Sequence, residues 1–141
     1  MKKRVLIFIV SYNAEKNIEE VLNRIPDEIW SSEIFDVEIL IIDDESTDQT
    51  FYQAEDYVHR NGRSDITTIL YNPKNLGYGG NQKLGYHYAI QNGFDVVALL
   101  HGDGQYAPEY LSQMINPILE GAPGNRARRT AIWGPFHIRT L

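Results

Sequence analysis

Blocks of mostly hydrophobic residues recur along the chain, and each block is short and rich in β-branched side chains. They occupy residues 5–10, 38–42, 66–70 and 96–100. Their length and composition are typical of strands buried on both faces of a sheet. The sequence therefore predicts four buried strands. Each block is far shorter than the ~20 residues that span a bilayer.

Segments with helical spacing alternate with these blocks. Apolar residues recur three and four positions apart in residues 18–25 and 111–119, and more weakly in 51–58 and 84–88. Such stripes are typical of helices with one face against a core. The alternation predicts an α/β fold, with a mostly parallel sheet and helices on both of its faces.

Local signals mark where these helices begin and end. Ser46 and Gln49 fit a capping box, and Pro108 suits the first turn of a helix. Gly62 and Gly93 each follow an asparagine, and we expect these residues to end the second and third helices with positive φ angles.

Residues 121–141 follow a different pattern. A loop at 121–125 and a cluster of arginines precede a predicted fifth strand over residues 130–136, and no helix follows it. A doubly wound sheet that stops at its fifth strand leaves apolar surface uncovered. We therefore expect residues 121–141 to be an atypical or truncated tail, and the fold to be incomplete at its C-terminus.

Length, net charge and amino-acid composition exclude several classes of function. A length of 141 residues fits one domain, and a net charge of −6 argues against a nucleic-acid partner. The absence of cysteine excludes disulfides, thiolate metal sites and cysteine nucleophiles. No signal peptide begins the chain, so these residues are expected in the cytoplasm, with a longer parent protein able to lie at the cytoplasmic face of a membrane.

Polar residues collect where three of the strands end. The first strand leads into residues 11–15, the second into 43–46 and the fourth into 101–105. Carboxyl ends of parallel strands meet at one edge of a sheet, where such folds bind ligands. Asp103 and Gln105 offer oxygen ligands that suit Mg²⁺ or Mn²⁺. The alternative is a simple turn, since Asp and Gly are common turn residues.

Other residues at this edge have two interpretations each. Of Asp43 and Asp44, one can accept a hydrogen bond from a base or ribose while the other caps a helix, or both can simply favour the helix start. Tyr12 can stack on a base or pack against the protein. The glycine-rich loop 75–81 can hold phosphate on backbone N–H groups, although it matches neither the dinucleotide nor the P-loop motif.

Taken in order, these segments resemble the nucleotide-sugar-binding half of a family 2 glycosyltransferase with the GT-A (Rossmann-like) fold. Residues 5–15, 41–50, 75–77 and 95–106 carry the resemblance. The branch that they most resemble is the polyprenyl-phosphate sugar transferases. The resemblance implies that residues 1–120 bind a UDP- or GDP-linked sugar. It also implies inverting, metal-dependent transfer to an acceptor such as a lipid phosphate.

The resemblance also implies roles for individual residues. The nucleotide-sugar-binding residues would be Val10, Tyr12, Glu15, Asp44, His101, Gly102 and Asp103. Asp44 would contact uracil or guanine. Asp103, the last carboxylate of a D-x-D motif, would hold Mg²⁺ or Mn²⁺ on the diphosphate, with Gln105 as a further metal ligand. His101 replaces the first aspartate of that motif, Glu45 replaces the glycine of a D-D-G-S motif, and the acceptor-side residues would lie beyond the chain.

Three alternatives stay open on the sequence alone. Residues 39–45 resemble the first strand and acidic pair of a phospho-acceptor receiver domain, but here the pair follows the second strand. A nucleotidyltransferase would need a basic glycine loop after the first strand, and residues 11–15 do not supply one. A donor-binding remnant without activity is favoured by His101 and by the short chain.

Overall fold

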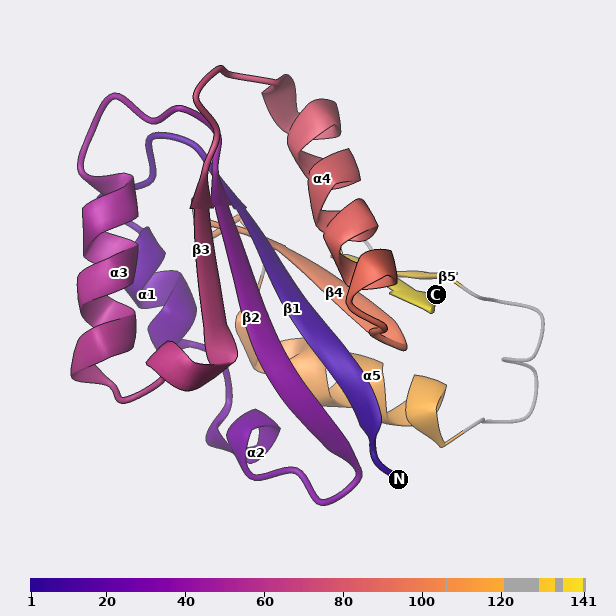
Figure 1. The fold of residues 1–141 in the computed structure, drawn as a ribbon. Helices are drawn as coiled ribbons and strands as arrows, with labels where there is room; N and C mark the ends of the chain where they lie inside the picture. Colours follow the sequence, from indigo (N-terminus) through magenta and orange to yellow (C-terminus); the bar gives the residue numbers. More distant parts are fainter. Residues whose placement is uncertain (106, 121–129, 134–135, 141) are drawn as a thin grey trace.

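A six-stranded sheet with helices on both faces forms the protein (Figure 1). The computed structural model describes residues 1–105, 107–120, 130–133 and 136–140. The sheet has the strand order β3-β2-β1-β4-β6-β5. Its strands are β1 (Lys3–Ser11), β2 (Phe35–Asp43), β3 (Thr67–Tyr71), β4 (Val96–His101), β5 (Thr130–Trp133) and β6 (Phe136–Thr140). The first four pair in parallel, whereas β6 pairs antiparallel with both β4 and β5.

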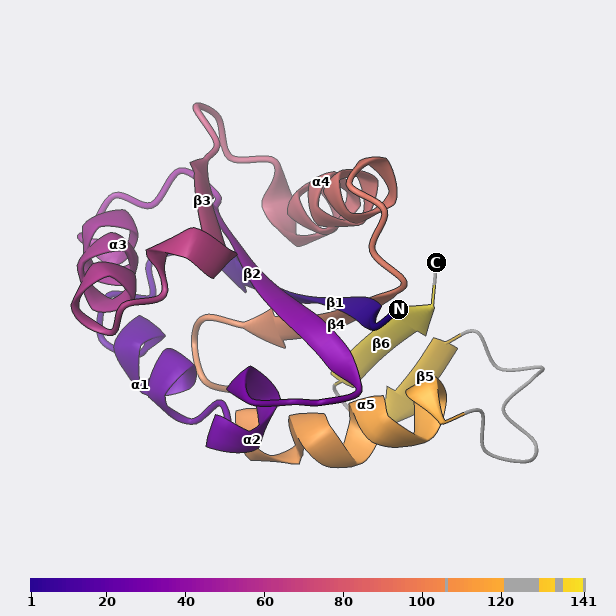
Figure 2. The same cartoon turned by 60° about the horizontal axis from the view of Figure 1, so that its bottom comes forward.

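Five α-helices are described, together with two short 3₁₀ turns. The helices are α1 (Ile18–Asn23), α2 (Asp27–Trp30), α3 (Thr50–Arg60), α4 (Gly77–Gln91) and α5 (Leu111–Leu119), and the turns are η1 (Ser64–Ile66) and η2 (Pro108–Tyr110). Figure 2 shows α4 on one face of the sheet and the other helices on the opposite face. The predicted α/β fold with helices on both faces is confirmed.

The central strand β1 supplies hydrophobic side chains to both layers of the core. Val5, Ile7 and Ile9 face the layer formed by α1, α2, α3 and α5, whereas Leu6 and Phe8 face α4. All five are completely buried. Successive side chains of a strand point to opposite faces, so a continuous apolar run is what a strand covered on both sides requires.

The structure corrects three predictions about individual elements. Of residues 18–25, only 18–23 form a helix, α1, because Pro26 disfavours a helical conformation at the residue before it; α2 then begins at Asp27. The strand expected to be buried at 66–70 is the edge strand β3, where Leu70 and Tyr71 are exposed. In place of one strand over 130–136, the structure has β5 and β6.

The predicted helix ends at glycine are confirmed. Gly62 and Gly93 have φ angles of 65° and 70°, directly after α3 and α4.

Among the helices of the described residues, none has both the length and the apolar character needed to cross a membrane.

Candidate functional site

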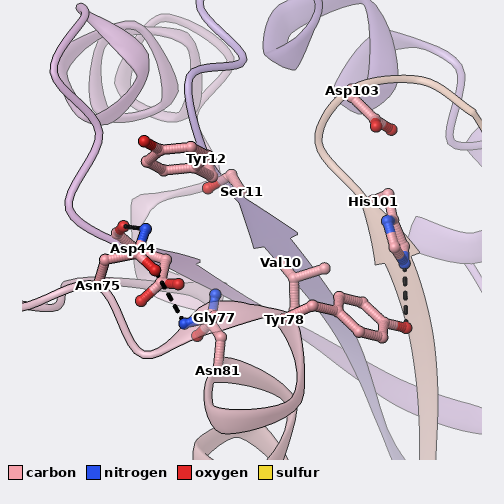
Figure 3. A pocket seen from close by; sticks show the side chains of 10 residues that line it. All are labelled: Val10, Ser11, Tyr12, Asp44, Asn75, Gly77, Tyr78, Asn81, His101 and Asp103. Atoms are coloured by element: carbon pink, nitrogen blue, oxygen red, sulfur yellow. Dashed lines mark hydrogen bonds between the residues drawn. The ribbon is translucent and has the colours of Figure 1, made fainter.

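A pocket of about 310 Å³ opens at the carboxyl edge of the parallel strands (Figure 3). Ten residues line it: Val10, Ser11, Tyr12, Asp44, Asn75, Gly77, Tyr78, Asn81, His101 and Asp103. They come from the ends of β1, β2 and β4 and from the start of α4. The strand order places β1 between β2 and β4, so the topology brings these three ends together.

The loop after β1 carries Tyr12 to the pocket, where its side chain is 53% exposed. Asn13, which follows it, has a left-handed backbone with φ of 47°. The backbone N–H of Asn13 donates to Ser46 Oγ at 2.9 Å, and Asn13 Oδ1 accepts from Thr47 N at 2.9 Å. These bonds join the β1 loop to the β2 loop and thereby fix the backbone that holds Tyr12.

The expected capping box at Ser46 and Gln49 is wrong, because the helix begins later. α3 starts at Thr50, and Asp48 Oδ1 accepts the backbone N–H of that residue at 2.9 Å. Burial disfavours the charged form of Asp48, but hydrogen bonds from the Thr50 side chain and backbone and from Glu15 N outweigh it and lower the Asp48 pKa. Ser46 is instead the acceptor that holds the β1 loop.

Asp44 is a buried carboxylate at the end of β2, only 4% exposed. Its Oδ1 atom accepts hydrogen bonds from Leu76 N at 2.8 Å and from Asn72 Nδ2 at 2.9 Å. Its Oδ2 atom has no hydrogen-bond partner within the described part of the chain, and Asp44 lines the pocket. One oxygen therefore anchors the loop before α4, while the other belongs to a carboxylate that lines the pocket.

The glycine-rich segment lies mostly inside α4, which corrects the prediction of a loop over residues 75–81. The helix begins at Gly77, whose N–H donates to Asn75 Oδ1 at 2.9 Å. Asn81, one turn into the helix, is 2% exposed and donates from Nδ2 to Ile42 O at 3.1 Å. α4 is thus fastened to the end of β2 and presents Tyr78 to the pocket.

His101 ends β4 on the other side of β1. Its Nε2 atom lies 3.1 Å from Tyr78 Oη, and the two rings are 4.8 Å apart between centroids (Figure 3). This contact joins β4 to the first turn of α4 across the pocket. His101 therefore lies in the pocket wall, although it has an imidazole where the D-x-D motif has a carboxylate.

Asp103 lies beyond His101 with an exposed side chain. Its Oδ1 atom accepts from Gln105 N at 3.1 Å, and no described residue donates to Oδ2. No cluster of three or more acidic or histidine side chains suited to a metal occurs among the described residues. A single exposed carboxylate still fits Mg²⁺ or Mn²⁺, because such ions often bind through one carboxylate and the substrate's phosphates.

The predicted site residues fall into two groups. Val10, Tyr12, Asp44, His101 and Asp103 line the pocket together. The other three, Glu15, Gly102 and Gln105, are not among its lining residues.

These three residues shape the loops around the pocket. The Glu15 carboxylate accepts from Gln49 N at 3.1 Å, and Gln105 donates its backbone N–H to Asp103. Gly102 is packed so closely that a Cβ there would lie 2.9 Å from Ser11 Cβ. The structure therefore gives Glu15 and Gly102 contacts that position the neighbouring strands and loops.

Comparison with known proteins identifies the family. The model of the family described as Glycosyl transferase family 2 matches residues 6–137. The chain belongs to this family. Family membership decides against the receiver and nucleotidyltransferase hypotheses. The match also extends beyond residue 120, the predicted end of the donor-binding part.

The chain is also similar to lipid-phosphate sugar transferases. The polyprenol monophosphomannose synthase of Mycolicibacterium smegmatis is 26% identical over 120 residues, which cover 85% of this chain and 43% of that protein. The undecaprenyl-phosphate mannosyltransferase of Micrococcus luteus is 27% identical over 115 residues, 82% of this chain and 44% of that protein. The chain thus spans less than half the length of these two relatives.

Solved structures confirm the GT-A fold. A Pyrobaculum calidifontis mannosyltransferase in complex with GDP-Man and Mn²⁺ superposes with a TM-score of 0.62 at 18% identity, covering 89% of this chain and 34% of that one. The S. aureus protein TarS in complex with UDP-GlcNAc gives a TM-score of 0.61 at 26% identity, covering 85% and 32%.

Proposed function

We propose that this chain forms the donor-binding part of a family 2 glycosyltransferase that takes a sugar from a UDP- or GDP-linked donor. One observation carries the proposal. The pocket at the carboxyl edge combines an exposed aromatic ring, a buried carboxylate with a free oxygen and an exposed carboxylate, at the ends of three adjacent strands. Each of these groups matches one part of a nucleotide diphosphate.

The nucleobase is assigned to the side of the pocket near β2. Tyr12 offers a ring face for stacking on the base, and Val10 forms an apolar wall beside it. Asp44 Oδ2 accepts a hydrogen bond from a base N–H, which uracil and guanine both present. Because Asp44 is held through Oδ1 by two donors, it is oriented before the ligand arrives.

The diphosphate is assigned to the side near β4. Asp103 would hold Mg²⁺ or Mn²⁺ there, with Gln105 as a further ligand, and the ion would offset negative charge on the departing diphosphate. Mn²⁺ accompanies GDP-Man in the P. calidifontis structure, which supports a divalent cation. Tyr78 and His101 close the same side of the pocket through their mutual contact.

Transfer is proposed to invert the anomeric carbon by direct displacement. An acceptor oxygen forms the new bond to that carbon as the bond to the diphosphate breaks, and the nucleoside diphosphate leaves with the electron pair. The relatives' names support a polyprenyl phosphate as acceptor. Such an acceptor is already an anion, so its attack needs no strong general base.

Thermal unfolding of the chain with UDP, GDP or ATP, each with Mn²⁺ or with a chelator, tests the proposal. A ligand at 100 times its dissociation constant stabilises the folded state by about 2.7 kcal/mol, provided that it binds only that state. For a chain of this size we expect a rise of about 8 °C in the unfolding midpoint. The rise should occur with UDP or GDP and Mn²⁺ only. A cooperative transition that no nucleotide shifts would contradict the donor site.

Donor binding without turnover is a second candidate, favoured by His101 in place of the aspartate of the D-x-D motif. Incubation with GDP-mannose or UDP-N-acetylglucosamine, Mn²⁺ and undecaprenyl phosphate separates the two candidates. Mass-spectrometric detection of a glycosylated lipid phosphate supports the transferase. Nucleotide binding without such a product, in a protein that also carries the acceptor-binding half, supports the second candidate.

A further inference from the structure

We propose that Glu45 is a positioning residue that holds the loop of residues 72–77 in the conformation that completes the pocket. The inference rests on the proposed function, because the pocket it completes is the proposed nucleotide site. Glu45 does not line that pocket. It acts through the backbone of Asn75, which does.

Glu45 has a backbone conformation that is unusual for its residue type. Its φ angle is 63°, in the left-handed region, where a side chain with a Cβ is disfavoured and glycine is tolerated. Strained conformations of this kind persist where the surrounding contacts determine them, and they cluster at functional sites. The strain at Glu45 thus calls for a compensating contact.

That contact is made by the Glu45 carboxylate. Its Oε2 atom accepts the backbone N–H of Asn75 at 2.7 Å, a short charge-assisted hydrogen bond between residues thirty positions apart. A glycine in this position would adopt the same backbone without strain, but it would have no carboxylate to offer. The side chain therefore supplies something that the backbone turn does not need.

The bond from Glu45 is part of a continuous set of contacts from β2 to the pocket wall. Asn75 also donates from Nδ2 to Asp44 O at 3.0 Å, and its Oδ1 accepts from Gly77 N at the start of α4 (Figure 3). The next residue, Tyr78, contacts His101. Fixing Asn75 therefore fixes the first turn of α4, and with it the part of the pocket wall that α4 forms.

Three variants separate the carboxylate from the strain. Glu45→Gln keeps an acceptor for Asn75 N and keeps the Cβ. Glu45→Ala keeps the Cβ without the acceptor, and Glu45→Gly removes both. We expect the variants that keep the Cβ to be less stable than Glu45→Gly, with the unfolding midpoint of Glu45→Gly about 3 °C above that of Glu45→Ala. We expect nucleotide affinity, in contrast, to be highest in Glu45→Gln, the variant that keeps the acceptor.

The binding measurement is calorimetric titration of each variant with GDP and with UDP in the presence of Mn²⁺. Glu45→Gly and Glu45→Ala should both bind the preferred nucleotide about fivefold more weakly than Glu45→Gln, because the loop spends less time in the competent conformation. Amide hydrogen exchange of residues 75–77 without nucleotide should be faster in the same two variants. If Glu45 affected stability alone, the order of nucleotide affinities among the three variants would match the order of their unfolding midpoints.

The outcomes distinguish this inference from the proposed function. Equal nucleotide affinity and equal exchange in Glu45→Gly and Glu45→Gln would overturn the positioning role and leave the donor site intact. A parent chain that binds neither nucleotide with Mn²⁺ would overturn both. Weaker binding by the more stable Glu45→Gly supports the positioning role, because loss of stability cannot explain it.

Discussion

Asp44 and Asp103 are carboxylates of the same chemical type, and their surroundings suit them to different tasks. Asp44 is buried and held by two donors on one oxygen, so its remaining oxygen has a fixed direction. Asp103 is exposed, and among the described residues only Gln105 donates to its carboxylate, through its backbone N–H. A rigid acceptor suits a base with a fixed pattern of donors. A solvated carboxylate suits a hydrated cation that also binds phosphate.

Replacement of Asp103 by alanine tests this division at the level of one residue. We expect Asp103→Ala to lose the Mn²⁺-dependent rise in unfolding midpoint with UDP or GDP. The midpoint without ligand should stay within about 2 °C of the parent's, because exposed substitutions change stability little. The matched control is Asp65→Ala, an exposed carboxylate in η1, which should keep the full response. An unchanged response in Asp103→Ala would remove the metal role.

The sequence shows which residues end the strands, but it does not show which side chains face the pocket. Tyr12 and Asp103 were predictable because they follow apolar runs whose carboxyl ends share an edge, whereas Val10, the last residue of such a run, was implied by the family resemblance. Tyr78 and Asn81 were not, since their place depends on where α4 begins and on its rotation against β2. The glycines around Tyr78 were the available signal, and they indicated a loop as readily as a first helical turn.

At the scale of elements, α4 packs closely against the sheet because its residue at the contact is a glycine. Gly85 lies so close to β1 that an added Cβ would be 2.0 Å from Phe8 Cε1. α4 is the helix that covers its face of the sheet among the described residues, and Leu6, Phe8 and Val10 lie beneath it. The close approach therefore sets the depth at which α4, and with it the pocket wall, sits on the sheet.

Substitution of two α4 glycines should have opposite effects on stability. Gly85→Ala gains helix propensity but forces the Phe8 ring to move, and we expect a net loss of about 1–3 kcal/mol from overpacking. Gly79→Ala has no atom within 4 Å of the added Cβ and should gain about 0.5–1 kcal/mol. Urea unfolding of both variants provides the measurement. Equal stability of Gly85→Ala and the parent would show that α4 shifts without cost.

Hydrophobic runs were sufficient to place the strands, but the ends of the elements depend on contacts that local patterns do not contain. β2 begins at Phe35, before the predicted residue 38, because β1 is long enough to pair with it from Lys3 onward. α3 begins at Thr50 because Asp48 supplies the acceptor for its first N–H group. The exposure of β3 follows from its position at the sheet edge, which its apolar composition does not indicate.

For the molecule as a whole, the order of the strands determines the site. The pocket exists because β1 lies between β2 and β4, so polar residues about thirty and ninety positions away from Tyr12 meet beside it. Regular alternation of strands and helices made the parallel part of the sheet predictable. The antiparallel pairing of β6 with β4 was not, because the amino-acid pattern of residues 130–140 does not indicate which strand of the sheet β6 joins.

The same strand order predicts how the molecule opens. β1 has a parallel neighbour on each side and five consecutive residues with no exposure, whereas β3 has one neighbour and a partly exposed face. Amides of β1 should therefore exchange only through global unfolding, and those of β3 through local opening, on the order of a hundredfold faster. Native-state hydrogen exchange in low concentrations of urea distinguishes the two routes, because global opening accelerates steeply with denaturant and local opening does not. If β3 and β1 exchanged at one rate with one urea dependence, the edge strand would open only with the whole domain, and the sheet would be a single cooperative unit from β3 to β4.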